Sequence, residues 1–281
     1  MEVFMEQCSF SSGPFKTQRL ESTITRIEID LENIQIPYNQ PVWCRVVRGD
    51  VCLDVFVFLR DRNKLFVFGQ DALTKNRSEL PYFYRTKWHS YFDGSFVTFN
   101  DPTLYLKRGI RGGWWQLPGA IELANEFILR LANRLEVQNE NVCIYGASAG
   151  GFFALAMAEL IREATIIADI PQVDLLKSPF SFNETILRDA GVKEFKSVFH
   201  WWEIESPPEK IILLMNVKDT KHIRTQLGIF LQAVSDRYYS NGRMIKKLVI
   251  EEYRNLDESR RGHSPLEETQ LIPFINATLD S

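Results

Sequence analysis

The chain has 281 residues, which at about 150 residues per domain allows one large or two small domains and excludes a mini-protein. Apolar residues make up 45% and charged residues 25% of the chain, so the composition provides a packed core and excludes a fibre or wholesale disorder. The 33 basic and 36 acidic residues give a net charge of −3, which supplies no broad attraction to nucleic acid or anionic lipid.

The N-terminal segment lacks the features of an export signal. Glu2 and Glu6 are acidic and the first basic residue is Lys16, whereas a signal peptide begins with basic residues and continues into an unbroken apolar run. The apolar stretches are far shorter than the roughly 18 residues of a membrane-spanning helix. The four cysteines, at positions 8, 44, 52 and 143, form no C-x-x-C pair. We therefore expect a cytoplasmic protein with reduced, mostly buried thiols.

The first part of the chain favours strands. Isoleucines at positions 24, 27, 29, 34 and 36 lie among polar residues, so residues 1–50 are interpreted as a β-rich extension that packs on the core. Apolar runs at 51–59, 64–68 and 95–99 follow, and turn residues separate them.

After residue 119 strands and helices alternate. Helices are expected at 120–135, 151–162 and 223–239, and strands at 142–145, 165–170, 210–216 and 246–253. This alternation predicts an α/β catalytic domain over 51–281, with a mostly parallel central sheet flanked by helices. The runs VCIY, TIIADI and IILLMN are continuously apolar, as in strands covered on both faces. Residues 174–206 interrupt the rhythm and are predicted to form a small lid.

The sharpest local signal is a G-x-S-x-G motif formed by Gly146, Ser148 and Gly150. An apolar strand precedes it and an amphipathic helix is expected after it, which is the context of a nucleophile elbow. Small neighbours let strand and helix approach closely, so the serine hydroxyl is presented at the carboxyl edge of the sheet. The N–H of Ala149, at the helix start, is a candidate oxyanion donor. The alternative is a tight turn that merely uses small residues.

A serine nucleophile needs a base, and in this fold order the acid and then the histidine follow it. His263 lies in a loop after the last predicted strand and is the first choice, with an exposed histidine of no role as the alternative. His200 lies among aromatic residues of the expected lid, where it packs or contacts substrate. His222 is expected to open a helix and to cap it or face solvent.

The orienting acid is predicted to be Asp219, which directly follows the next-to-last strand. The alternative for Asp219 is helix N-capping, and Asp257 and Glu258 are reserve candidates. Gln70, in the turn after residues 64–68, is the candidate second oxyanion donor, placed by topology alone.

These features resemble the α/β-hydrolase superfamily over roughly residues 50 to 281. The segments FNDPTLY (99–105), GWW (113–115), YGASAGGF (145–152) and PQ (171–172) are similar to a narrower bacterial group. That group includes the acetyltransferase-like component of accessory Sec systems and proteins encoded with surface-glycan biosynthesis. The resemblance implies acyl-ester chemistry on a carbohydrate or glycoprotein, commonly transfer or removal of an O-acetyl group.

Some residues of these segments are candidates for substrate binding. Asp101, Trp114 and Trp115 follow the strand that ends near residue 99, and aromatic faces suit sugar rings, although tryptophan is also a common core filler. Gln172 could hydrogen-bond a substrate hydroxyl or simply close a turn.

Two functions from different classes remain. The first is a serine acyl hydrolase or acyltransferase without a cofactor, which acts on a small-molecule or oligosaccharide ester and uses acetyl-CoA as acyl donor if it is a transferase. The second is a non-catalytic glycan-binding or complex-forming protein that keeps the fold and uses surface tryptophans at 114, 115, 201 and 202. Thiol and metal hydrolysis are disfavoured, because no cysteine has an elbow context and no metal-ligand motif occurs.

Overall fold

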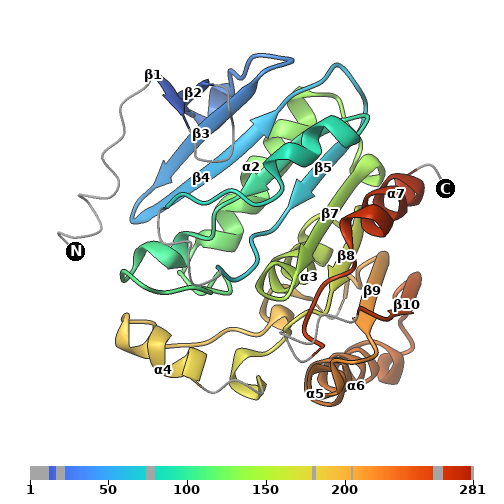
Figure 1. Ribbon diagram of the computed structural model, residues 1–281. Coiled ribbons are helices and arrows are strands. Elements are labelled where there is room, and N and C mark those ends of the chain that lie inside the picture. Colours follow the sequence, from blue (N-terminus) through green and yellow to red (C-terminus); the bar gives the residue numbers. More distant parts are fainter. Residues whose placement is uncertain are drawn as a thin grey trace.

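A computed structural model describes residues 13–16, 23–73, 80–178, 182–203, 205–255 and 262–279. Their backbone forms one ten-stranded sheet in the order β1-β2-β3-β4-β6-β5-β7-β8-β9-β10 (Figure 1). The strands are β1 (Gly13–Lys16), β2 (Thr23–Glu28), β3 (Pro41–Arg48), β4 (Val51–Phe58), β5 (Leu65–Phe68), β6 (Ser95–Phe99), β7 (Val142–Ala147), β8 (Thr165–Asp169), β9 (Lys210–Asn216) and β10 (Lys247–Tyr253).

The sheet is mostly parallel, as predicted. Every neighbouring pair from β6 through β5, β7, β8 and β9 to β10 is parallel. The antiparallel pairs, β1–β2, β3–β4 and β4–β6, lie toward the N-terminal edge. Parallel neighbours need long crossovers, and α2 (Ala120–Arg134), α3 (Ala149–Leu160) and the segment with α5 (Thr220–His222) and α6 (Gly228–Arg237) provide them.

Two strands, β1 and β3, were not predicted individually. Strand β3 carries Arg45 in its middle, which breaks the apolar pattern that marks a strand in the sequence. The structure buries this arginine by pairing it with Asp54 of β4 through two hydrogen bonds of 2.8 Å. Strand β3 pairs with β4 along its whole length, so residues 23–48 continue the same sheet as the rest of the chain.

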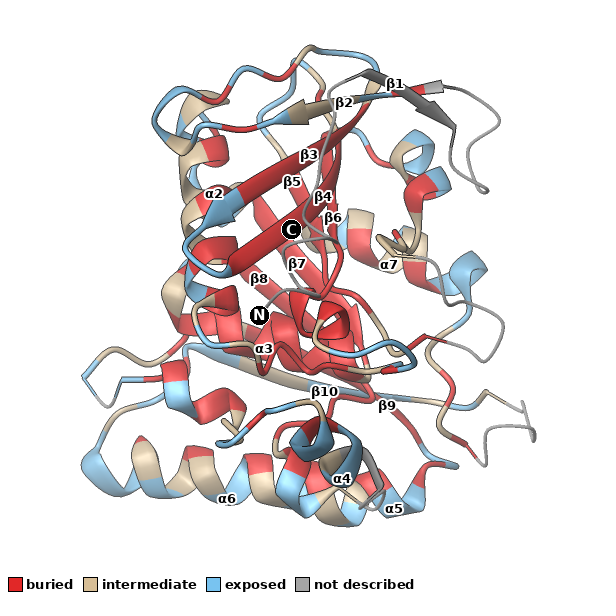
Figure 2. Cartoon of the chain, turned by 90° about the vertical axis from the view of Figure 1, so that its left-hand side faces the viewer, coloured by how far each residue is buried: buried red, intermediate tan, exposed pale blue. Residues whose placement is uncertain are grey.

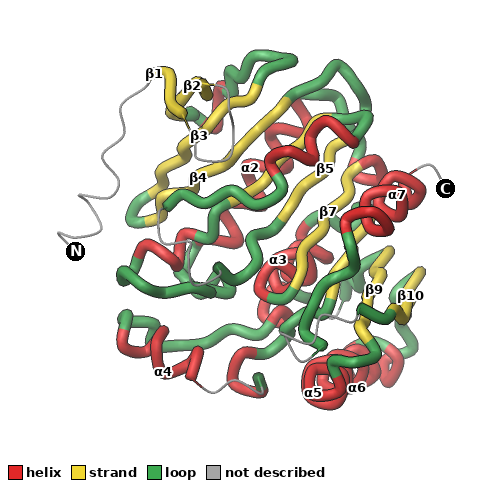
Figure 3. The backbone as a smooth tube through the Cα atoms, viewed as in Figure 1, coloured by secondary structure: helices red, strands yellow, loops and turns green. Residues whose placement is uncertain are grey.

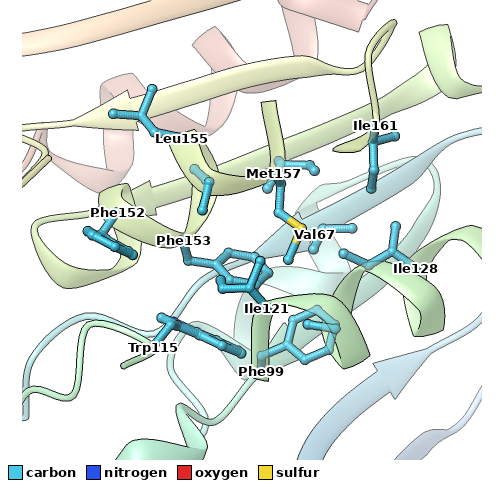
Figure 4. Close-up of a cluster of buried hydrophobic side chains, with 14 of the residues drawn as sticks. Val67, Phe99, Trp115, Ile121, Ile128, Phe152, Phe153, Leu155, Met157 and Ile161 are labelled. Atoms are coloured by element: carbon cyan, nitrogen blue, oxygen red, sulfur yellow. The ribbon is translucent and has the colours of Figure 1, made fainter. Parts of the chain in front are cut away.

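Two apolar layers cover the two faces of the sheet, and successive residues of β7 point into opposite layers. Val142 and Ile144 face the layer that contains α2, α3 and α6, whereas Cys143 and Tyr145 face the layer that contains α7 (Glu268–Leu279). Figure 4 shows part of the first layer, where Phe153 and Met157 of α3 lie near α2 residues. The central strands are buried throughout (Figure 2), which explains their continuous apolar runs.

Helix α3 differs from the expectation of an amphipathic helix, because its residues from Ala149 to Glu159 are all buried. Its outer side is covered by the end of the 174–206 insertion. The indole N–H of Trp202 donates to the Leu155 carbonyl at 2.8 Å, and the Trp201 ring meets Phe152 edge-on at 5.9 Å. The insertion thus completes the burial of the helix that follows Ser148.

The rest of the insertion contains α4 (Phe182–Asp189), which lies below the carboxyl ends of β5 and β7 in Figures 1 and 3. The insertion therefore extends along the side of the sheet on which Ser148 lies.

Three of the four thiols, those of Cys44, Cys52 and Cys143, are buried and in no disulfide bond, as expected, and Cys8 lies outside the described residues. Burial raises the pKa of the Cys143 thiol to about 12, so this thiol is protonated at neutral pH and is a poor nucleophile. Among the helices that the structure describes, none combines the length and the apolar composition needed to cross a bilayer.

Candidate active site

Ser148 sits in the sharp turn between β7 and α3 with backbone angles of φ 55° and ψ −113°. Positive φ strains any residue with a Cβ, so the surroundings must hold it. The Ser148 N–H donates to the Asp169 carbonyl at 3.0 Å, and the Ser148 carbonyl accepts from Phe152 N–H at 3.1 Å. Both neighbouring elements therefore fix the turn.

The glycines of the motif allow this close approach. A Cβ on Gly146 would lie 2.0 Å from the Gly150 carbonyl oxygen, and a Cβ on Gly150 would lie 2.8 Å from an Asp71 carboxylate oxygen. Side chains at these positions would push the strand and the helix apart, so the sequence pattern has the structural cause expected for an elbow.

The structure brings Ser148, His263 and Asp219 into one chain of hydrogen bonds. His263 Nε2 lies 2.8 Å from Ser148 Oγ, and His263 Nδ1 lies 2.5 Å from Asp219 Oδ2. A carboxylate only accepts hydrogen bonds, so Nδ1 carries the imidazole proton and Nε2 is left to accept the proton of the serine hydroxyl. This arrangement can deprotonate Ser148 and stabilise the imidazolium that results.

Asp219 follows β9, and its side chain is only 3% exposed. Asp219 makes the contacts of both interpretations, because it N-caps α5 through the His222 N–H and also binds the His263 ring. Burial alone would raise the pKa of its carboxyl group, but the hydrogen bonds from the two histidine rings hold that pKa below its usual value. Asp219 is therefore an anion at neutral pH. Asp257 and Glu258 lie outside the described residues.

The loop that carries His263 is fitted closely onto the loop of Asp219. Gly262 has φ 87°, and a Cβ there would lie 2.4 Å from the Lys218 carbonyl carbon, so only glycine allows this approach. Beyond His263, the Ser264 carbonyl accepts from the Asn216 side chain at 3.2 Å and from the Tyr253 hydroxyl at 2.8 Å. Strands β9 and β10 thus position the imidazole.

The two predicted oxyanion donors belong to Ala149, which follows Ser148, and to the turn of Gly69 and Gln70, which approaches the elbow through Gly69. Ala149 is the first residue of α3, where backbone N–H groups have no intrahelical acceptor. Gln70 follows Gly69, whose N–H donates to the Tyr145 carbonyl at 2.9 Å. A Cβ on Gly69 would lie 2.8 Å from the Gly150 carbonyl oxygen, so this turn packs closely against the elbow. The Gln70 side chain is buried and bonds the Asp101 N–H and the Tyr82 carbonyl, which fixes this turn.

Comparisons with known proteins identify the fold. No family model and no curated protein matches the sequence. The capsule O-acetyltransferase of Neisseria meningitidis serogroup A aligns with a TM-score of 0.60 and 12% identity over 84% of this chain and 96% of that one. Acetyl xylan esterase 1 from Thermoanaerobacterium sp. JW/SL YS485 aligns with 0.55 and 12% over 99% and 91%. An esterase of the archaeon Pyrobaculum calidifontis aligns with 0.52 and 15% over 87% and 88%.

The chain has an α/β-hydrolase fold. The resemblance predicted this fold correctly, and the order of serine, acid and histidine along the chain is the order expected for an α/β-hydrolase.

Asp101 and Trp115, predicted to contact substrate, lie inside this α/β-hydrolase domain. Asp101 is 2% and Trp115 is 1% exposed. The Asp101 carboxylate accepts from the backbone N–H groups of Thr103 and Trp115. Burial raises its pKa to about 6, although these hydrogen bonds lower it in part. The Trp115 ring packs on Phe153 at 4.4 Å. Asp101 thus fixes the fold of the 101–116 segment, and Trp115 packs that segment against α3.

Trp114 and Gln172 are also buried, but Gln172 lies beside Ser148 and Trp114 is bonded to Gln172. The Trp114 indole N–H donates to Gln172 Oε1, which lies 3.5 Å from Ser148 Oγ. His200 is exposed in the insertion, and its ring meets Trp201 edge-on at 5.1 Å. The structure therefore places His200 against the covering of α3 and gives it no part in the hydrogen-bond chain of Ser148, His263 and Asp219.

The expectation of surface tryptophans at 114, 115, 201 and 202 is wrong. Their exposed fractions are 3%, 1%, 9% and 3%. The reason is that the 101–116 segment and the insertion both fold back onto α3, so their indoles fill the core instead of facing solvent. The non-catalytic glycan-binding hypothesis loses the surface on which it depended.

His222 is the site residue that sequence reasoning missed. It is 1% exposed, its Nδ1 lies 2.8 Å from Asp219 Oδ1, and its ring stacks on that of His263 at 4.0 Å. The expectation that it caps a helix or faces solvent is wrong for its side chain. Its spacing of three residues from Asp219 was the available signal, because such residues share one side of a helix.

Asp219, His222 and His263 also form a cluster whose candidate ligand atoms all lie within 4.8 Å of one another. A metal ion would need lone pairs of these groups directed at one point. Here the Nδ1 atoms of both histidines point instead at the two oxygens of one carboxylate. The geometry is that of a hydrogen-bond relay, in which the donors already have their acceptor.

Proposed function

We propose that this protein is a serine-dependent acyl-ester hydrolase or acyltransferase that forms an acyl-enzyme on Ser148. The observation that carries the proposal is the hydrogen-bond chain from Ser148 Oγ to His263 Nε2 at 2.8 Å and from His263 Nδ1 to Asp219 Oδ2 at 2.5 Å. Nucleophile, base and orienting acid are all in reach of one another, which is the geometric requirement for this chemistry.

In the first half-reaction, Ser148 Oγ bonds to the ester carbonyl carbon while its proton passes to His263 Nε2. The carbonyl oxygen becomes an oxyanion, which the N–H groups of Ala149 and Gln70 would stabilise. The intermediate then expels the alcohol, which takes the proton from His263, and the acyl group stays on Ser148. Asp219 remains an anion throughout and stabilises the imidazolium.

In the second half-reaction, water or a sugar hydroxyl gives its proton to His263 and bonds to the acyl carbon. The Ser148–acyl bond breaks, and Ser148 recovers its proton from His263. No cofactor takes part in either half. Hydrolysis and transfer differ in the acceptor, and in the transfer reaction acetyl-CoA would serve as acyl donor, with the CoA thiol leaving in place of the alcohol and taking the proton from His263.

The proposed substrate is an O-acetyl ester of a carbohydrate or glycoconjugate. Two structural neighbours with the same fold are, by name, a capsule O-acetyltransferase and an acetyl xylan esterase. The sequence segments that resemble the glycan-biosynthesis group include Gln172, which lies beside Ser148, and Trp114, whose indole donates to Gln172.

Covalent labelling with a fluorophosphonate probe tests the proposed nucleophile. We expect the label on the Ser148 peptide, no label in Ser148→Ala, and labelling slowed on the order of 10³-fold or more in His263→Ala. Ser240→Ala is the matched control, because Ser240 is exposed and its hydroxyl donates to the nearby Ser235 carbonyl at 3.0 Å. Absence of label on Ser148 in the folded wild type would refute the proposal.

Product analysis then separates the two reactions and tests the substrate. Acetylated oligosaccharide in water should lose acetate if the protein is an esterase. Unacetylated oligosaccharide with acetyl-CoA should gain acetyl groups if it is a transferase. Labelling of Ser148 without either product would leave the acyl-enzyme chemistry in place and refute the carbohydrate substrate.

A further inference from the structure

A second histidine shares the carboxylate of the proposed triad. Asp219 Oδ2 is bonded by His263 Nδ1, and Asp219 Oδ1 is bonded by His222 Nδ1 at 2.8 Å. The two imidazole rings stack at 4.0 Å with 25° between their planes. His222 is more deeply buried than His263, with 1% against 18% of the side chain exposed.

The other side of His222 meets Gln172. His222 Nε2 lies 3.1 Å from Gln172 Nε2. The orientation of this amide follows from Trp114, because an indole N–H only donates and therefore requires the amide oxygen, Oε1, opposite it. The amide nitrogen of Gln172 must then face His222.

This orientation fixes the proton positions on His222. An amide nitrogen only donates, so His222 Nε2 must accept and carries no proton. The remaining proton is on Nδ1, which donates it to Asp219. A doubly protonated His222 would place an N–H against the Gln172 amide, so the contacts select the neutral ring with its proton on Nδ1.

The contacts close a ring around the nucleophile. It runs from Ser148 to His263, Asp219, His222 and Gln172, and Gln172 Oε1 returns to within 3.5 Å of Ser148 Oγ. Gln172 and His222 are only 2% and 1% exposed, so the loss of one hydrogen bond in this ring would leave a buried polar group without a partner and destabilise the site.

We infer that His222 is a positioning residue of the reaction: it holds Asp219 through Nδ1 and Gln172 through Nε2. It thereby fixes both the carboxylate that orients His263 and the amide that lies beside Ser148. This role rests on the proposed function. Its bond to Asp219 also takes up part of the carboxylate charge that would otherwise act on His263 alone, so removing it strengthens the hold of Asp219 on the imidazolium.

Three variants separate the two bonds. In His222→Asn the side-chain NH₂ takes the place of Nδ1 and keeps the bond to Asp219, while the bond to Gln172 is lost. In His222→Gln the amide oxygen takes the place of Nε2 and keeps the bond to Gln172, while the bond to Asp219 is lost. His222→Phe keeps the stacked ring and loses both bonds. The same changes at His89, whose ring stacks on Phe58 away from the site, are the matched controls.

The readout is the rate of fluorophosphonate labelling of Ser148 across pH. For His222→Gln we expect the pH of half-maximal rate to rise by roughly half a unit or more, because Asp219 then acts on His263 alone. For His222→Asn that pH stays at the wild-type value, while the plateau rate falls roughly tenfold because Gln172 is released. His222→Phe should show both changes. The His89 variants should show neither.

Histidine nitrogen NMR of the wild-type protein that has not reacted with the fluorophosphonate probe provides a readout that does not depend on activity. It should show His222 neutral with the proton on Nδ1. A proton on Nε2, or wild-type rates and pH dependence in all three His222 variants, would overturn the inference while labelling of Ser148 upholds the proposed function. Conversely, an Nδ1 proton on His222 in a protein that never labels at Ser148 would refute the proposed function and leave the hydrogen-bond ring in place.

Discussion

Two buried carboxyl groups at the ends of neighbouring strands behave in opposite ways. Asp169 ends β8, and burial raises its pKa to about 7, although hydrogen bonds from two tyrosine hydroxyls and the Leu266 N–H lower it in part. Asp219 follows β9, where two histidines outweigh burial and lower its pKa. With these neutral partners Asp169 holds its proton up to about pH 7, whereas the imidazoles keep Asp219 an anion.

The two groups also act on the same loop in different ways. The Tyr253 hydroxyl has one proton, but it lies 2.6 Å from Asp169 and 2.8 Å from the Ser264 carbonyl. A protonated Asp169 donates to Tyr253, and Tyr253 then donates to Ser264. Asp169 therefore holds the backbone next to His263, while Asp219 holds the imidazole ring. Each of the following changes breaks or sharpens this contrast.

The largest expected effect is that of Asp219→Asn. An amide presents an NH₂ group to one of the two histidines, whose Nδ1–H then has no acceptor and whose ring loses its orientation. We expect the rate of Ser148 labelling and of ester turnover to fall on the order of 10⁴-fold. Asp236→Asn, on the exposed part of α6, is the control. A loss of less than tenfold would assign the orienting role to another acid.

The next largest effect is expected for Gly262→Ala, which moves the His263 loop without touching the side chains of the site. The added Cβ would lie 2.4 Å from the Lys218 carbonyl carbon, so the loop must shift away from Asp219. A displacement near 1 Å costs about 100-fold in rate. Gly109→Ala carries a similar positive φ of 94° with no atom within 4 Å of its Cβ, so it reports the backbone strain alone. Equal rates in the two variants would contradict this view of the loop.

Asp169→Asn tests the other half of the contrast through stability. Because folding raises the pKa of Asp169, the folded state binds the extra proton, and the stabilisation is complete below about pH 4 and lost as pH rises through about 7. Asparagine reproduces the protonated acid, with an NH₂ group for Tyr253 and an oxygen for Leu266. We expect near-wild-type activity and a stability that no longer falls by up to about 1.4 kcal/mol per pH unit over this range.

Denaturant unfolding of wild type and Asp169→Asn between pH 4 and 8 measures that difference. Asp219 has the opposite sign, since its lowered pKa gives stability above about pH 4 that is lost on acidification. If stability changes with pH in the same way in wild type and Asp169→Asn, Asp169 is ionised in the folded protein. The proposed donation from Asp169 to Tyr253 and from Tyr253 to Ser264 would then be wrong.

Much of the fold could be predicted because the central strands are buried on both faces, and such burial requires continuous apolar runs in the sequence. The runs at 142–145, 165–170 and 210–216 are strands in the structure, and the helices expected at 120–135, 151–162 and 223–239 are present as α2, α3 and the segment that contains α6. Strand β3 was not predicted because its Arg45 is paired with Asp54, which lies nine residues away on the partner strand. A buried ion pair looks like two surface charges until the pairing of the strands is known.

At the site, chain order sufficed to predict that Ser148, Asp219 and His263 would meet, because the ends of neighbouring parallel strands share one edge of the sheet. Chain order did not place His222 or the tryptophans. Trp114 and Trp115 both have positive φ, at 47° and 56°, so their indoles turn inward against any regular pattern. Such a turn depends on contacts with Asp101 and α3, which no local sequence rule describes.

The smallest expected effect is that of Trp114→Phe, which removes one neutral hydrogen bond from the edge of the site. The phenyl ring keeps most of the packing, but Gln172 Oε1 loses the indole N–H that sets the amide orientation. A neutral hydrogen bond is worth about 1 kcal/mol, so we expect Ser148 labelling to slow about threefold to tenfold. Trp201→Phe removes an indole bond to Glu122 at 3.0 Å and should cost similar stability without slowing the labelling. Equal slowing in both variants would mean that Trp114 acts through packing alone, and the orientation of Gln172 would then have to be set by His222.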